Sequence, residues 1–219
     1  MIAKPLALRF LAASFMAAVL ALSAFSALGP EKLTFTRVFK SSTPEYIQIV
    51  VRNDSDTASY DIRQLEEDPG SAPFQVSSAL RARMFSLAEK LHDFNGLDLD
   101  VHRKIAYLGE KTFKWEQGSQ SYETKFNYTL NPTAAELLRI FEGLARQQEL
   151  FELINRSMRY DRLGVNDALV QLETDMNHGL LPEPQGLLPL LDQIGADERI
   201  VDIARQRARS LADRIRHPR

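Results

Sequence analysis

The chain has 219 residues, of which 44% are hydrophobic, an ordinary fraction for a globular protein with a core of its own. Its formal net charge of −2 gives it no general attraction to nucleic acid. The absence of cysteine excludes disulfide bonds, a thiol nucleophile, cysteine-ligated zinc, iron–sulfur clusters and lipid attachment to a leader cysteine.

Residues 1–28 have the layout of an export signal. Lys4 and Arg9 give the start of the chain a positive charge, and a nearly unbroken apolar stretch follows over residues 10–22. Small residues just before Ala27 fit cleavage at that point. Removal of this signal peptide would leave 25 basic and 29 acidic residues, a net charge of −4.

The alternative is an uncleaved signal anchor. The apolar run extends to Leu28, and about 19 apolar residues are enough to cross a bilayer. Membrane contact is then expected only through residues 6–28. We favour cleavage because the flanking residues fit it. Either outcome makes the folded part extracytoplasmic, either periplasmic or secreted. A cysteine-free exported chain is more typical of a bacterium than of a eukaryote.

The segment after the leader is predicted to begin with a strand and a hairpin. Residues 33–39 alternate between apolar and polar, as in a half-buried strand. Residues 46–52 and 57–65 are predicted to pair around the four-residue loop 53–56, and residues 68–73 to form a loop. This loop length makes one face of the hairpin apolar. Its predicted pairs are Ile47 with Ile62, Ile49 with Tyr60, and Val51 with Ala58.

A helix and a further strand are expected next. Ser77 or Ser78 is placed to cap a helix whose apolar residues recur every three or four positions as far as Phe94. Asn95-Gly96 ends it. Residues 97–107 alternate between apolar and polar and are predicted to form a strand with one polar face.

The most strongly patterned stretch, residues 113–130, is predicted to be a second hairpin with Gly118-Ser119 as its two-residue turn. One face then pairs Trp115 with Tyr122, Phe113 with Thr124, Lys111 with Phe126, and Gly109 with Tyr128. On the other face Lys114 lies opposite Glu123, a favourable pair of charges. Two faces that agree on one register support the hairpin.

The rest of the chain is predicted to be helical. Asn131-Pro132 fits the start of a long helix that reaches Ile154, and three shorter helices are expected at 166–176, 186–194 and 197–215. The fold class is therefore α+β: an antiparallel sheet of two hairpins plus an N-terminal strand, covered by two amphipathic helices. We divide the chain into the leader (1–28), an α+β domain (29–158) and a helical C-terminal segment (159–219).

Asp98, Asp100 and His102 are a candidate metal site. As alternate residues of a strand they would point the same way, and His92 lies just upstream. Carboxylate oxygens and a neutral imidazole are common metal ligands. A solvated strand face shows the same alternation, however, and this interpretation is preferred. We expect no cofactor and no bound metal.

The aromatic residues of the second hairpin are a candidate binding surface. A row formed by Trp115, Tyr122, Phe126 and Tyr128 could stack against bases or sugars, but two amphipathic helices need a sheet face to cover. We therefore expect this row to belong to the core. Trp115, near the tip of the hairpin, is expected to be the most exposed of the four, and Trp115 with Tyr122 is the only candidate binding surface on the hairpin.

The C-terminus is basic. Arginines recur from Arg205 to Arg219, in and just after the last predicted helix, while Asp197 and Glu198 begin that helix. This distribution complements a helix dipole, so we interpret the arginines as a surface feature and not as a nucleic-acid site.

These observations predict an exported protein of the bacterial envelope that acts as a non-catalytic binding or structural module. The sequence holds no serine-hydrolase elbow, zinc-protease helix or glycine-rich phosphate loop. Another envelope protein is the expected kind of partner. The two alternatives are a metal-assisted hydrolase that uses Asp98, Asp100 and His102, and a membrane-tethered partner protein with an uncleaved leader.

Overall fold

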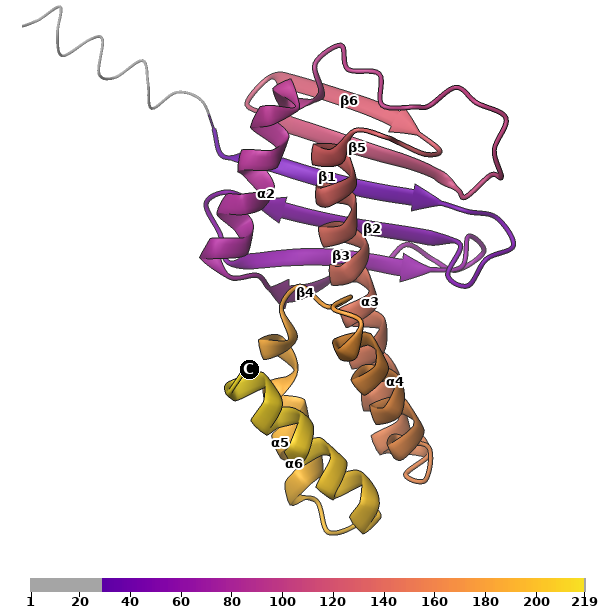
Figure 1. Cartoon of the computed structure of the whole chain (residues 1–219), viewed down its shortest axis with the longest axis vertical. Helices are drawn as coiled ribbons and strands as arrows, with labels where there is room; N and C mark the ends of the chain where they lie inside the picture. The colour runs from indigo at the N-terminus through magenta and orange to yellow at the C-terminus, as the bar shows by residue number, and fades with distance from the viewer. Residues whose placement is uncertain (1–28, 219) are drawn as a thin grey trace, which may run out of the picture.

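The computed structural model describes residues 29–218 and shows an α+β fold (Figure 1). Six strands form one sheet in the order β4-β3-β2-β1-β5-β6, in which all neighbours are antiparallel. The strands are β1 (Glu31–Val38), β2 (Tyr46–Arg52), β3 (Thr57–Arg63), β4 (Ala72–Gln75), β5 (Glu110–Gln117) and β6 (Gln120–Phe126). The predicted fold class is confirmed.

Both predicted hairpins have the expected register. In the first, Ile47 pairs with Ile62 and Ile49 with Tyr60. In the second, Trp115 pairs with Tyr122 and Lys114 with Glu123 around the Gly118-Ser119 turn. Gly118 has φ +57°, a conformation that glycine adopts without strain, which explains the two-residue turn. The ladder ends at Phe126, so the predicted pairing of Gly109 with Tyr128 is wrong.

The sheet contains one strand, β4, that the sequence did not predict. Residues 72–75 belong to β4, although Pro and Gly there predicted loop up to residue 73. Pro73 lacks an N–H donor, and β4 is a short edge strand, where a missing ladder hydrogen bond is tolerated.

The predicted strand over residues 97–107 is wrong, because residues 97–109 form an irregular loop. The Asp98 carboxylate accepts a hydrogen bond from the Asp100 N–H at 3.1 Å, and the Asp100 carboxylate accepts one from the His102 N–H at 3.2 Å. His102 itself has φ +49°. Each aspartate side chain therefore forms a turn with the residue two positions later. These two turns repeat at every second residue, as the side chains of a strand do, although no strand is present.

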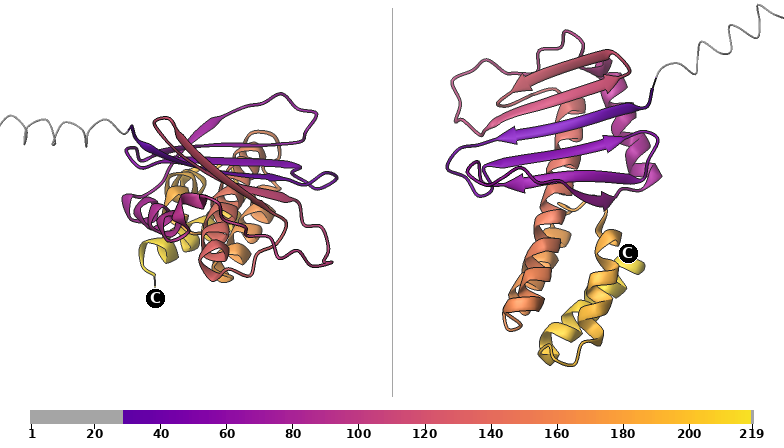
Figure 2. Two further views of the ribbon diagram at one scale, coloured as in Figure 1. Left: turned by 90° about the horizontal axis from the view of Figure 1, so that it is seen from above. Right: turned by 180° about the vertical axis from the view of Figure 1, so that it is seen from behind.

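Two helices cover one face of the sheet, as predicted, and the other face is open (Figures 1 and 2). They are α2 (Ser78–Lys90), capped by Ser77, and α3 (Pro132–Tyr160), capped by Asn131. Phe141 of α3 lies 5.2 Å from Phe35 of β1, measured between ring centroids. The predicted helix end at Phe94 is wrong, since α2 stops at Lys90 and the 3-10 helix η1 (His92–Phe94) follows with positive φ angles.

The second half of α3 extends beyond the sheet and forms a helical arm with the C-terminal helices (Figure 1). These are α4 (Val165–Asn177), the 3-10 helix η2 (Pro184–Leu187), α5 (Leu188–Ala196) and α6 (Asp202–Arg216). The arm has its own hydrophobic cluster, to which α3 contributes Leu150 and Ile154. Hence α3 takes part in both cores. The predicted start of the last helix at Asp197 is wrong, because α6 begins at Asp202.

The predicted leader, residues 1–28, lies outside the described residues, so cleavage, anchoring and location stay predictions. Among residues 29–218, no helix combines the length and apolar character that a membrane crossing requires.

Candidate functional site

A groove lies where the sheet layer meets the helical arm. Its volume is about 770 Å³. One wall is the start of α2 with the end of β4, and the other is the segment that leads from α4 into η2. Its lining residues are Asp56, Gln75, Val76, Ser77, Ser78, Ala79, Leu80, Arg83, Pro182, Glu183, Gln185 and Gly186.

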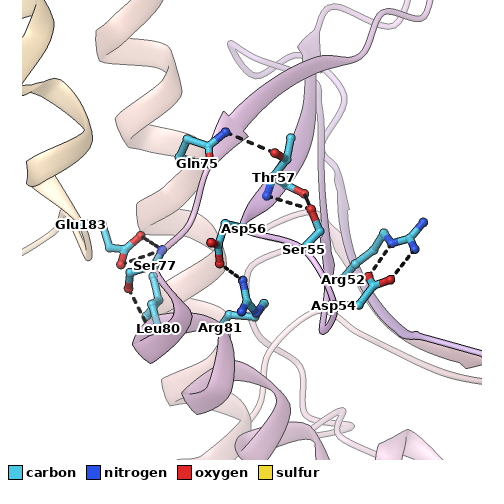
Figure 3. A network of polar contacts seen from close by, with 10 residues as sticks. All are labelled: Arg52, Asp54, Ser55, Asp56, Thr57, Gln75, Ser77, Leu80, Arg81 and Glu183. Carbon is cyan, nitrogen blue, oxygen red and sulfur yellow. Dashed lines mark hydrogen bonds and ion pairs between the residues drawn. The ribbon is translucent and has the colours of Figure 1, made fainter.

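A hydrogen bond joins the two walls. The Glu183 carboxylate accepts the backbone N–H of Ser77 at 2.9 Å and 3.2 Å (Figure 3). Ser77 is the N-cap of α2, and its hydroxyl oxygen accepts the Leu80 N–H at 3.1 Å. The first turn of α2 holds no acidic residue of its own. Glu183 therefore supplies the negative charge that the N-terminal end of a helix dipole favours.

The wall formed by β4 and α2 is also fixed by polar interactions. Arg81 of α2 forms an ion pair with Asp56, whose backbone carbonyl accepts the Val76 N–H at 2.8 Å (Figure 3). The Gln75 amide donates to the Thr57 hydroxyl at 3.2 Å. These contacts connect β3, β4 and α2, so this wall of the groove is built before any ligand arrives.

A second compartment of about 400 Å³ continues the groove between α2 and α3. The two compartments share Leu80, Arg83 and Pro182. Gly143 of α3 lies against the segment that leads from α4 into η2, which we call the crossing segment. A Cβ atom at position 143 would be 2.5 Å from the Leu180 carbonyl oxygen. Glycine at position 143 therefore sets how closely the segment approaches α3.

Three arginines line the second compartment. Arg83 donates to the Glu136 carboxylate at 2.7 Å and 2.9 Å. Arg146 donates to Asp175 at 2.6 Å, and Arg139 is exposed and forms no ion pair within residues 29–218. Opposite charges held in place on an open surface suit the recognition of a polar partner.

The groove is lined by both charged and apolar side chains. Its lining residues include no histidine. The Ser77 hydroxyl is engaged as a helix cap, and within residues 29–218 no basic side chain forms a hydrogen bond with a lining serine. Acyl transfer by a serine requires such a base within hydrogen-bond reach.

The structure does bring Asp98, Asp100 and His102 together, in the exposed loop and not on a strand. The His102 ring lies 2.6 Å from Asp98 and 3.6 Å from Asp100. Asp100 also accepts the backbone N–H groups of Asn127 at 2.8 Å and Tyr128 at 3.3 Å. His92 lies in η1.

Hydrogen bonds hold these three side chains in place and shift their pKa values. The hydrogen bond to Asp98 raises the pKa of His102 above 6.5, and the same bond lowers the pKa of Asp98. Hydrogen bonds from the Asn127 and Tyr128 N–H groups lower the pKa of Asp100. Within residues 29–218, no three acidic or histidine side chains have an arrangement suited to a metal ion.

The aromatic row belongs mainly to the core. Trp115 is only 4% exposed and stacks on Tyr122, with the ring centroids 5.7 Å apart. Phe126 is buried as well, whereas Tyr128 is 43% exposed. The expectation that Trp115 would be the most exposed of the four is wrong. It belongs to the buried cluster that the sheet shares with α2 and α3, while Tyr128 lies past the end of the ladder.

The C-terminal arginines bind the arm helices together. Glu173 of α4 accepts from Arg207 and Arg214 of α6, and Arg216 donates to Asp192 of α5 at 2.6 Å. Asp197 lies before α6 and pairs with Arg199 at 2.8 Å. The prediction that Asp197 and Glu198 begin the last helix is therefore wrong.

Sequence reasoning missed the groove because its walls come from distant segments. Pro182-Glu183-Pro184 reads as a separator between helices, and nothing local connects Glu183 with Ser77. The missing acid in the first turn of α2 was the only available signal.

Comparison with known proteins assigns no family to the chain: no family model matches it, and no curated protein is significantly similar to it in sequence.

Proposed function

We propose that the chain is an exported protein of the bacterial envelope that acts as a non-catalytic binding module, and that the groove between α2, α3 and residues 179–186 is its binding site. The observation that supports this most directly is the groove itself, about 770 Å³ with a continuation of about 400 Å³. Protein binding sites are typically concave and largely built in advance. The fixed contacts of Ser77 and Arg81 fit that description.

The expected partner is another envelope protein that presents a polar segment to the groove. Arg83, Arg139 and Glu183 offer both charges along its length. Leu80 and Pro182 supply apolar contact between them. Charged groups held by their neighbours lose little side-chain entropy on binding, which favours a specific partner. The proposed location follows from the predicted export signal in residues 1–28.

Site-specific photo-crosslinking in bacterial cells tests the binding site. Ala79 and Ala82 are both exposed on α2, but only Ala79 lines the groove. A crosslinking residue at position 79 should capture a defined envelope protein, and one at position 82 should not. The variant Ala79→Trp fills the groove and should abolish binding of that protein in a purified assay. Equal capture at both positions, or unchanged binding by Ala79→Trp, would contradict the proposal.

Three further measurements separate the alternatives. Hydrolysis of any ester, glycoside, phosphate or peptide in a broad panel would overturn the non-catalytic assignment. Stoichiometric metal lost in His102→Ala would favour the metal-assisted hydrolase that uses Asp98, Asp100 and His102. N-terminal sequencing of the exported protein distinguishes a cleaved signal peptide from a tethered form.

A further inference from the structure

The irregular loop 97–109 carries an exposed surface that the proposed function does not use. All residues from His102 to Leu108 are exposed. Together with the neighbouring segment 127–130 they form a patch, which we call the loop patch. Its large apolar members are 42% to 62% exposed: Ile105, Tyr107, Leu108, Tyr128 and Leu130. In Figure 1 the loop lies beyond the ends of β5 and β6, away from the helical arm.

Hydrogen bonds hold the two segments of the loop patch against each other. The Asn127 side chain accepts the Leu108 N–H at 2.7 Å and donates to the Ala106 carbonyl at 3.0 Å. The Val101 N–H donates to the Tyr128 carbonyl at 3.1 Å. Tyr107 packs edge-on against Phe39, with the ring centroids 5.8 Å apart. The apolar side chains are therefore presented to solvent by a braced loop.

A buried ammonium group fixes the base of the loop patch. Lys111 is 5% exposed, and its Nζ donates to the carbonyl groups of Leu108, Gly109 and Asn127 at 3.2, 3.4 and 2.9 Å. It closes the junction between the loop and the end of β6. Burial of an ammonium group costs free energy, and the three hydrogen bonds to carbonyl groups offset this cost.

The charges around the loop patch indicate its partner. Arg103 and Lys104 directly precede Ile105, and neither forms an ion pair within residues 29–218. The nearby acids are engaged: Asp98 with His102, and Glu110 with Lys125 at 3.9 Å. Positive charge beside isoleucine, leucine and tyrosine is the composition that binds at an anionic bilayer surface. Tyrosine favours the headgroup level.

We propose that the loop patch inserts into the interface of an anionic lipid bilayer, with Arg103 and Lys104 at the headgroups and Ile105 and Leu108 below them. Exposed backbone polar groups keep an irregular loop at this shallow depth. The first residue of β1 pairs with the last residue of β5, so the loop that enters β5 lies at the opposite end of the strands from the start of β1. The proposed contact does not involve residues 6–28.

The absence of cysteine makes a direct test possible. The full chain with Ala106→Cys carries one thiol, to which an environment-sensitive fluorophore is attached. Phosphatidylcholine vesicles that contain phosphatidylglycerol should shift its emission to the blue, and pure phosphatidylcholine vesicles should not. The same label at Ser210→Cys, on α6, is the control and should not shift, even when the chain is bound through its leader.

Substitutions then test the assigned side chains. Arg103→Gln with Lys104→Gln should raise the amount of anionic lipid needed for the shift by about 30-fold, the effect of two basic groups near a charged membrane. Ile105→Ser with Leu108→Ser should abolish the shift, whereas Ile203→Ser, a similarly exposed apolar position on α6, should leave it unchanged.

Three results would overturn the proposal. They are an unshifted label at position 106 on anionic vesicles, an equal shift at position 210, and a shift that follows protein concentration without lipid. The last would make the loop patch a self-association surface. None of these outcomes depends on the groove, so the proposed function stands or falls separately.

Discussion

The carboxylate of Glu183 accepts the backbone N–H of Ser77 at 2.9 Å, although the two residues lie 106 positions apart in the chain. This contact joins the N-terminus of α2, on the sheet layer, to the segment that leads into η2, in the helical arm. It also forms one end of the groove. This charged hydrogen bond therefore adds a second connection between the sheet layer and the arm, beside the continuous helix α3, and helps to set the shape of the groove.

Removal of this contact should weaken the junction. We expect Glu183→Ala to lower the free energy of unfolding by about 1 kcal/mol, because the end of α2 loses its acidic partner. Denaturant unfolding measures this loss. Glu198→Ala, which removes an exposed acid that forms no ion pair within residues 29–218, should change stability by less than about 0.5 kcal/mol. Equal effects of the two substitutions would show that the contact contributes nothing.

A methyl group at position 143 should push the crossing segment away from α3. In Gly143→Ala the new Cβ would lie 2.5 Å from the Leu180 carbonyl and 2.8 Å from Pro182. Overpacking of this kind costs about 1–3 kcal/mol, more than the gain of about 0.5–1 kcal/mol from alanine in a helix. The matched control is Gly70→Ala, which meets no atom within 4 Å. Thermal unfolding that ranks Gly143→Ala as neutral would contradict the close packing.

The pair His102 and Asp98 should titrate outside the usual ranges. The pKa of His102 is raised above 6.5 by the hydrogen bond to Asp98, and the pKa of Asp98 is lowered below 3.8 by the same bond. The contribution of His102 to stability is thus fully present below pH 6.5 and lost as pH rises through its folded-state pKa. The contribution of Asp98 to stability is present above pH 3.8 and is lost as the pH falls through the folded-state pKa of Asp98.

An NMR titration of the imidazole checks this directly. The pKa of His102 should fall towards 6.5 in Asp98→Asn, since that variant cannot stabilise the imidazolium. A pKa of His102 at or below 6.5 in the unaltered protein would refute the observed pairing.

Replacement of the buried ammonium should loosen the loop patch. Burial lowers the pKa of Lys111, yet its Nζ satisfies three backbone carbonyls. Lys111→Met should therefore cost about 1–3 kcal/mol and increase amide hydrogen exchange over residues 105–109. Lys125→Met, at an exposed position on β6, should do neither. Unchanged amide hydrogen exchange in Lys111→Met would show that Lys111 does not support the loop.

Much of the fold could be predicted from local patterns. Both hairpins are specified by turn length and by a period of two, and a shift of one residue would move every apolar side chain to the wrong face. Asn131-Pro132 located the start of α3 because capping is a local interaction. The strand over residues 97–107 failed as a prediction, because consecutive aspartate turns have the same period as a strand.

The sequence by itself determined the α+β class, the registers and the absence of thiol chemistry, since these depend on neighbouring residues and on composition. Only the tertiary structure decided that Trp115 is buried, that the C-terminal arginines pair between helices, and that Ser77 meets Glu183 across the groove. The physical reason is the same in each case. Burial and ion pairing depend on which distant segments pack together, and no local sequence pattern predicts this packing.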